Sequence, residues 1–380
     1  MDYPYILNYF ILLVLAYLYW KKPDPRLVKW AFVLEFIFIA LRAPVVGADT
    51  WNYVRYLDGE RNFYIFKTED DLDPAFMIYR NIVSSWHAPR VLYMVLNTLL
   101  SCIPVYILIK RYSFNPILSL FLLPVLNIYY LYFCGLRQII GFGLLILGLM
   151  FVLEKRKKAV PIAITLAVLG FFFHKTIIIY VLVFLLAYLM QIKNRSIPII
   201  LVVISATVGI VLQAFNILDF FNFFINYNLL LEDRYEMYIM DDSKTVSSSL
   251  LSFLPSILVI ISFCAMEKRK LNHIFTKIYL LGVVIGNLFV SMPQINRLCV
   301  AFYIFGLVVF SWIWNEHLKC NIQLQKYVNI TLLLLLLWFT QAYIRNNIYS
   351  NIDLQAADRM HPYQFFWEDY RNHPSIKYFN

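Results

Sequence analysis

The chain has 380 residues, of which 61% are hydrophobic and 18% aromatic, and it contains only 11 glycines. A soluble protein this apolar would leave extensive hydrophobic surface in water, so the composition excludes an ordinary soluble enzyme. The net charge of +10 comes from basic residues that gather in alternate loops. Membrane proteins show this distribution on their cytoplasmic side, so we expect no nucleic-acid partner.

Apolar stretches long enough to cross a bilayer follow one another along the whole chain. Because about 20 helical residues span the hydrocarbon layer, the sequence predicts an all-α polytopic membrane protein with about twelve transmembrane helices, forming a single integral membrane domain over residues 1–380. The expected spans are 3–20, 27–46, 91–109, 115–133, 136–153, 159–173, 175–192, 197–215, 249–266, 274–292, 296–314 and 327–345.

The basic loops set the expected orientation of these spans. They contain Lys21-Lys22, Lys110-Arg111, Lys155 to Lys158, Lys193 with Arg195, and Lys268 to Lys270. The positive-inside rule places these loops in the cytoplasm, and therefore both termini outside. The first span has no preceding basic segment and no small-residue cleavage site, so it is expected to be retained and not removed as a signal peptide.

The loops on the opposite side are longer, at 47–90, 216–248 and the tail 346–380. They interleave aromatic residues with Asp, Asn and Arg, a mixture that suits sugars, because rings stack on sugar C–H faces while polar groups bind hydroxyls. We expect glycan contacts from Trp51, Tyr53, His361 and Tyr363. The alternative is the aromatic belt that membrane proteins carry at the interface.

Three spans begin at the outer face with a cation in or beside the first turn, namely Arg137, Lys175 and Arg297. Helix N-termini carry partial positive charge and free N–H groups, and an Arg fork beside them favours a phosphate. Three such ends on one face predict a diphosphate site. The alternative is that these side chains reach to lipid headgroups.

Several further polar residues are candidates for chemistry. Asp49 at the outer end of the second span has the position of a general base, or of a helix cap or a partner of Arg42 or Arg55. His174 is a candidate base or phosphate donor, or a structural interfacial histidine. Glu35 in mid-span is either functional or a buried hydrogen-bond partner of another helix.

The chain has no convincing site for a metal or a cofactor. Asp71-Leu72-Asp73 matches the short metal–nucleotide pattern of soluble glycosyltransferases, but many acidic loops do so too. The sequence shows no His/Cys cluster, P-loop or dinucleotide fingerprint. We therefore expect neither a metal nor a cofactor.

These motifs resemble a known family. The segment Leu41–Tyr53, LRAPVVGADTWNY, is similar to the "R…G-x-D-x-x-x-Y" signature of the EpsG-like family, bacterial multi-span proteins of the Wzy polysaccharide-polymerase type. GLRQ at 135–138 resembles the family's "R-Q" element, and FHKT at 173–176 its "F-H-x-S/T" element. Asn296-Arg297 and His361-Pro362-Tyr363 are weaker matches.

The resemblance implies a polymerase of undecaprenyl-diphosphate-linked oligosaccharide repeat units at the outer face of the bacterial plasma membrane, in O-antigen, capsule or exopolysaccharide synthesis. Its partners would be the lipid-linked donor and acceptor, membrane lipid, a chain-length regulator and a flippase. Arg137 and Arg297 would bind the donor diphosphate with Lys175, and Asp49 would be the base. Arg42 would hold Asp49 or contact phosphate.

Other functions remain open at this point. A flippase for the same lipid predicts internal repeats and polar residues near the membrane midplane. The sequence shows no repeat and few mid-span charges beyond Glu35. A transferase that adds one sugar from a polyprenyl phosphate, or a ligase of finished chains, would use the same outer-face cations. Chemistry at a lipid phosphate is therefore predicted more firmly than polymerisation.

Overall fold

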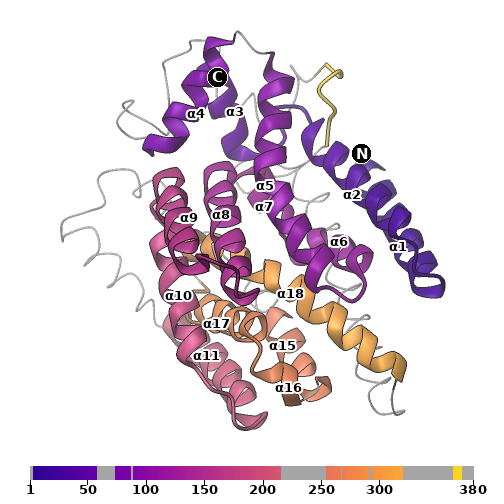
Figure 1. Ribbon diagram of the computed structural model, residues 1–380, viewed down its shortest axis with the longest axis vertical. Helices are drawn as coiled ribbons and strands as arrows, with labels where there is room; N and C mark the ends of the chain where they lie inside the picture. The colour runs from indigo at the N-terminus through magenta and orange to yellow at the C-terminus, as the bar shows by residue number, and fades with distance from the viewer. Residues whose placement is uncertain are drawn as a thin grey trace.

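A computed structural model describes residues 3–57, 73–86, 89–214, 254–266, 268–290, 293–319 and 363–369. In this part of the chain the fold is all-helical, which confirms the predicted class, and the only β pairing is an isolated bridge between Arg42 and Phe365. The helices, drawn in Figure 1, are α1 (Tyr3–Lys21), α2 (Pro25–Ala40), α3 (Ala48–Leu57), α4 (Pro74–Ser85), α5 (Arg90–Tyr112), α6 (Pro116–Val125), α7 (Tyr129–Phe133), α8 (Leu136–Leu153), α9 (Ala159–Phe173), α10 (Ile177–Leu189), α11 (Ser196–Ala214), α15 (Leu254–Ala265), α16 (Lys268–Leu271), α17 (Ile274–Leu288) and α18 (Pro293–Lys319).

The helices have the composition of a membrane protein. Among the described residues, three helices are long and apolar enough to cross a bilayer, namely α1, α5 and α8, and several shorter apolar helices accompany them. The number of spans and the sides of the termini stay predictions. The expected span 327–345 and the outer segment 216–248 lie outside the described residues.

The structure differs from the sequence-based expectation in two places. The expected span 115–133 is divided into α6 and α7. α6 ends at Val125, and Asn127 between the two helices has a left-handed φ of 57° that a continuous helix does not allow. The expected outer loop 47–90 contains the helices α3 and α4. Their apolar residues recur at helical spacing and bury one face in a small core that includes Tyr53, Phe76 and Tyr93.

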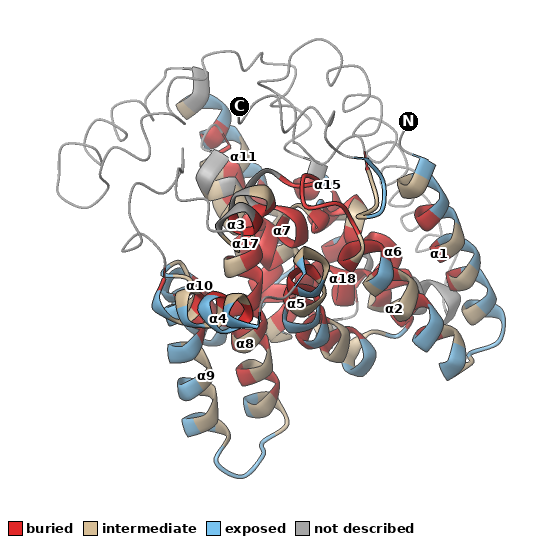
Figure 2. Ribbon diagram, turned by 90° about the horizontal axis from the view of Figure 1, so that it is seen from above, coloured by how far each residue is buried: buried red, intermediate tan, exposed pale blue. Residues whose placement is uncertain are grey.

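The main hydrophobic core lies in the middle of the bundle. Buried residues concentrate on α5, α6, α7, α17 and α18, whereas α1 and α9 expose most of their apolar side chains at the periphery (Figure 2). Such apolar outer faces suit lipid, because hydrocarbon solvates them at no hydrophobic cost.

Side-chain contacts bring several of the basic loops together. Arg111 in the last turn of α5 forms an ion pair with Glu154, the residue after α8. The indole Nε1 of Trp312 donates to the Tyr112 carbonyl at 2.6 Å. Asn272 bonds to the backbone of Ile192 through both its amide atoms, each at 2.7 Å. The loops after α5, α8 and α10 and the segment around α16 therefore share one end, as the alternation of charge predicts.

Glu35 has a structural setting in the described fold. Its carboxylate accepts hydrogen bonds from the Asn8 amide and the Tyr129 hydroxyl, each at 2.8 Å, and its side chain is buried. These bonds join α2 to α1 and α7. A mid-membrane carboxylate is costly unless it is paired in this way, so the structure favours the hydrogen-bonding role over a catalytic one.

Candidate functional site

The segment after α2 is organised around the buried Arg42, of which only 1% is exposed. The guanidinium donates to the carbonyls of Val46 at 3.1 Å and Tyr132 at 2.9 Å, and it also bonds to Ile39 and Thr50. It also lies over the Phe133 ring, 4.6 Å from the centroid. Arg42 therefore joins the end of α2 to α7 and to the start of α3.

Gly47 allows the segment between α2 and α3 to approach α7 closely. Its φ is +114°, and a Cβ atom placed there would lie 2.1 Å from the Phe133 carbonyl oxygen. The same oxygen accepts a hydrogen bond from the Thr50 hydroxyl. A residue with no side chain is required here by both the backbone angle and the close approach of α7.

We expect Gly47→Ala to lower the free energy of unfolding by about 3 kcal/mol or more, because it combines backbone strain with a backbone clash. The measurement is thermal unfolding of the purified protein in detergent, together with its yield in membranes. Gly135→Ala is the control, since the nearest atom to an added Cβ there is 3.3 Å away and φ is −97°. Unchanged stability of Gly47→Ala would contradict this reading.

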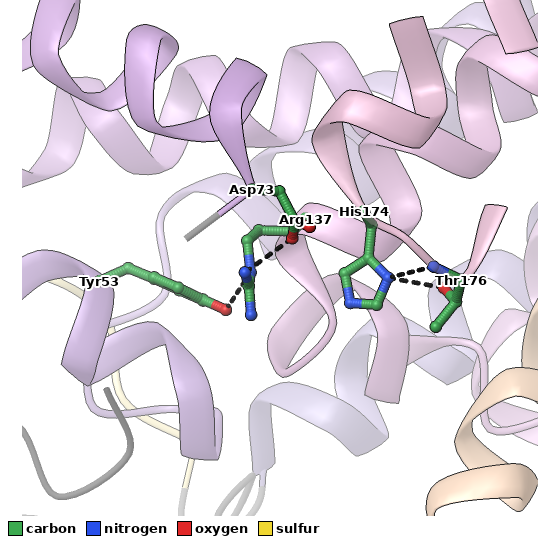
Figure 3. Close-up of polar contacts among 5 residues, drawn as sticks. All are labelled: Tyr53, Asp73, Arg137, His174 and Thr176. Carbon is green, nitrogen blue, oxygen red and sulfur yellow. Dashed lines mark hydrogen bonds and ion pairs between the residues drawn. The ribbon is translucent and has the colours of Figure 1, made fainter. Parts of the chain in front are cut away.

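Arg137, in the first turn of α8, lies at the centre of a polar cluster that also includes Tyr53 and Asp73 (Figure 3). Its guanidinium forms an ion pair with the Asp73 carboxylate at 2.8 Å, and its Nε donates to the Tyr53 hydroxyl at 2.9 Å. The side chains of Arg137 and Asp73 are 14% and 8% exposed. Three helices, α3, α4 and α8, thus supply one charged site.

Asp73 links this cluster to the turn between α9 and α10. The backbone N–H of Lys175 lies near its carboxylate and favours the ionised form. Burial raises the pKa of Asp73, while the positive charges of Arg137 and Lys175 oppose this rise. The Lys175 side chain itself is exposed.

His174 ends α9 and lies beside the same cluster (Figure 3). Its Nδ1 is 2.6 Å from the Thr176 hydroxyl and accepts the Thr176 backbone N–H at 3.3 Å. Burial, with the positive Arg137 nearby, lowers the pKa of His174 to about 3. The imidazole is therefore neutral at pH 7, and because Nδ1 accepts hydrogen bonds, Nε2 carries the proton.

This burial predicts sensitivity to acid. Below its ordinary pKa of 6.5, His174 binds a proton in the unfolded chain but not in the folded one until the pH approaches 3. Folding stability is therefore lost as the pH falls from 6.5, by about 2 kcal/mol at pH 5. We expect the drop in melting temperature between pH 7.5 and pH 5 to be smaller in His174→Gln than in the wild type. An equal drop would show that His174 does not titrate in this way.

The N-terminal parts of α8, α10 and α18 meet at the same end of the bundle, where Arg297 is the fifth residue of α18. The Gln138 amide donates to the Arg297 carbonyl at 3.4 Å and also bonds to the Tyr180 hydroxyl. That hydroxyl donates to the Leu298 carbonyl at 3.2 Å. The Arg297 guanidinium lies 5.1 Å from the centroid of the Tyr130 ring. Residues adjacent in sequence to Arg137 thus contact the backbone that presents Arg297.

The remaining candidate residues have different settings. Asp49 is the second residue of α3, one helical turn before Tyr53, and His361 lies outside the described residues. Trp51 is partly buried, with the Arg90 guanidinium 5.4 Å from its ring centroid. Tyr363 is 3% exposed and donates its hydroxyl hydrogen to the Phe38 carbonyl, so it fastens the 363–369 segment to α2.

Sequence reasoning did not identify Asp73 as a member of the site. The Asp71-Leu72-Asp73 pattern indicated only a weak metal motif. Asp71 lies outside the described residues. The Asp73-Pro74 pair is a recognisable helix start, but the ion pair joins residues separated by 64 positions. No local pattern contains that pairing.

The motifs of this cluster fall within a match to a family model, described as the EpsG family, over residues 26–365. The chain belongs to the EpsG family. No curated protein and no solved structure matches it. Membership in the EpsG family, together with the apolar helices, identifies a membrane protein associated with polysaccharide synthesis and is consistent with a glycosyltransferase-type polymerase.

Proposed function

We propose that this EpsG-family protein is a polymerase that joins undecaprenyl-diphosphate-linked oligosaccharide repeat units at the outer face of the bacterial plasma membrane. The observation that carries the proposal is the setting of Arg137. It is a mostly buried cation in a first helical turn, beside His174 and at the same end as Arg297. Cations fixed in a poorly solvated site stabilise the charge of a leaving diphosphate.

In the proposed reaction, a hydroxyl oxygen of the acceptor glycan attacks the anomeric carbon of the donor glycan. A new glycosidic C–O bond forms, the bond between that carbon and the diphosphate oxygen breaks, and the electron pair leaves with the diphosphate. Arg137 and Arg297 bind the diphosphate, and the exposed Lys175 adds positive charge at its edge. Their fixed charges replace part of the stabilisation that water gives to the free diphosphate.

Asp49 accepts the proton from the attacking hydroxyl in this scheme. Its support is positional: α3 carries Asp49 about one turn, roughly 6 Å along the helix axis, from the Tyr53 that bonds to Arg137. Arg42 orders the start of α3 through Thr50, so we assign it a positioning role in place of a phosphate contact.

His174 acts in the scheme as a hydrogen-bond donor. Its pKa of about 3 and its accepting Nδ1 leave a neutral ring with the proton on Nε2. Such a ring donates to a phosphate or hydroxyl oxygen without adding charge. A base at Nε2 would first require that proton to leave, so the geometry favours the donor role among those the sequence allowed.

Glycan contacts complete the proposal. Trp51, on α3 between Asp49 and Tyr53, and His361 in the tail are the candidate glycan contacts. Tyr53 and Tyr363 are 5% and 3% exposed, and their hydroxyls bond to Arg137 and to the Phe38 carbonyl, so we assign both a structural role. The donor and acceptor share the membrane with a flippase that delivers them and a chain-length regulator that limits the product, which we propose as the functional partners.

The experiment is a surface-glycan gel of the source bacterium with this gene deleted and then restored. Collapse of a polymer ladder to one repeat unit, reversed on restoration, supports the polymerase. Complete loss of surface glycan would instead assign the protein to transport of the lipid-linked unit. An unchanged ladder would remove it from polymer assembly.

A further inference from the structure

Asp73 is the N-cap residue of α4 but does not cap the helix. An Asp at this position ordinarily accepts a hydrogen bond from an N–H of its own first turn. Here the side chain makes no such bond. Its carboxylate instead contacts the Arg137 guanidinium at 2.8 Å and lies near the backbone N–H of Lys175. The carboxylate is therefore bound as an anion by groups from outside α4.

The groups that hold Asp73 are those that would bind a phosphate. An arginine fork and a backbone N–H are the common donors to phosphate oxygens, and the Lys175 side chain adds positive charge. A carboxylate and a phosphate use the same donors and repel each other. The carboxylate and a phosphate cannot both bind these donors fully, because little water is present to screen their repulsion. The Asp73 side chain is only 8% exposed.

We propose that the Asp73 carboxylate occupies the diphosphate-binding donors in the substrate-free protein, and that an incoming lipid diphosphate displaces it toward the first turn of α4. This inference rests on the proposed function. The displaced carboxylate has partners in reach, since the N–H groups of Ala75 and Phe76 are at the positions that an N-cap side chain ordinarily binds. A side-chain rotation exchanges one set of hydrogen bonds for the other.

The exchange gives Asp73 a role in turnover. A polymerase releases one diphosphate carrier after each transfer, and groups that bind the diphosphate tightly also slow its departure. A carboxylate that returns to Arg137 competes with the product and shortens its stay. Asp73 is thus a positioning residue that acts through Arg137.

The test measures binding of farnesyl diphosphate to the purified full-length protein in detergent, by titration calorimetry. Asp73→Asn keeps the shape of the side chain and removes its charge. We expect it to bind farnesyl diphosphate about tenfold more tightly than the wild type, a coupling of ordinary size for two competing sites, although its ligand-free melting temperature falls. Glu368→Gln removes a charge from the exposed, described tail and should leave the affinity unchanged.

The outcomes separate this inference from the proposed function. Binding that is absent in the wild type, or equal in the wild type and Arg137→Ala, overturns the diphosphate site and the inference together. Binding that depends on Arg137 but is unchanged or weaker in Asp73→Asn overturns the inference alone, because a merely structural ion pair predicts that result. Asp73→Ser, which can cap α4, is the second variant should Asp73→Asn fail to fold, and it too should bind more tightly.

Discussion

Arg137→Ala should reduce polymerisation at least about 100-fold, the loss usual when one donor to a transition-state charge is removed. The guanidinium is fixed by Asp73 and Tyr53 at 2.8 and 2.9 Å, so no neighbouring side chain replaces it without rearrangement. The measurement is the length distribution of surface glycan in cells that carry the variant, with the protein level in membranes determined in parallel. Short or absent ladders at a normal protein level are the expected result.

Two further variants sharpen this test. Arg137→Lys keeps the charge but lacks the planar fork, so we expect partial activity at most. Arg111→Ala removes an arginine from an exposed ion pair with Glu154 at the opposite end of the bundle and should polymerise normally. A full ladder from Arg137→Ala, at normal protein level, would end the assignment of this residue to the diphosphate.

Arg42→Ala is expected to have the second large effect, on folding itself. It would leave the buried carbonyls of Ile39, Val46 and Tyr132 without the donor they now have. Unsatisfied buried polar groups cost about 1–3 kcal/mol each, so we expect a loss of roughly 3–5 kcal/mol in the free energy of unfolding. The measurement is thermal unfolding in detergent and the amount of protein recovered from membranes.

This variant also separates the two roles that the sequence left open for Arg42. If the residue orders the segment, Arg42→Ala is poorly folded, and Arg42→Lys, which has fewer donors, is intermediate. If it contacts phosphate, Arg42→Ala folds normally and loses affinity for farnesyl diphosphate. The second pattern would contradict the positioning role. Arg111→Ala again serves as the control, because an exposed ion pair contributes at most about 1 kcal/mol.

In the proposed function, the cluster around Arg137 would act on a diphosphate by fixed charge. Helix starts supply N–H groups, Arg137 and Arg297 supply guanidinium groups, and neutral His174 supplies a donor without further charge. Asp73 balances the charge while the site is free of substrate. A buried cation without such a counterion would be costly to fold.

The sequence by itself determined the class of the protein and the order of its motifs. Hydropathy and helical period are local properties that can be recognised in the sequence alone. A bilayer requires runs of about 20 apolar residues, and most described helices lie where those runs predict them. The charge alternation predicted that the basic loops share one end, and the contact between Arg111 and Glu154 agrees. The sequence also predicted first-turn cations at Arg137, Lys175 and Arg297. Arg137 is in the first turn of α8, whereas Lys175 precedes α10 and Arg297 is the fifth residue of α18.

Only the tertiary structure decided what those residues contact. Arg137 meets Asp73 and Tyr53 across 64 and 84 positions of sequence, and Arg42 reaches Tyr132 across 90. Such partners depend on how helices pack, which side chains from all of them decide together, and no local pattern records the result. For the same reason the sequence predicts a loop where α3 and α4 form. Their apolar faces are explained only by the core that they cover.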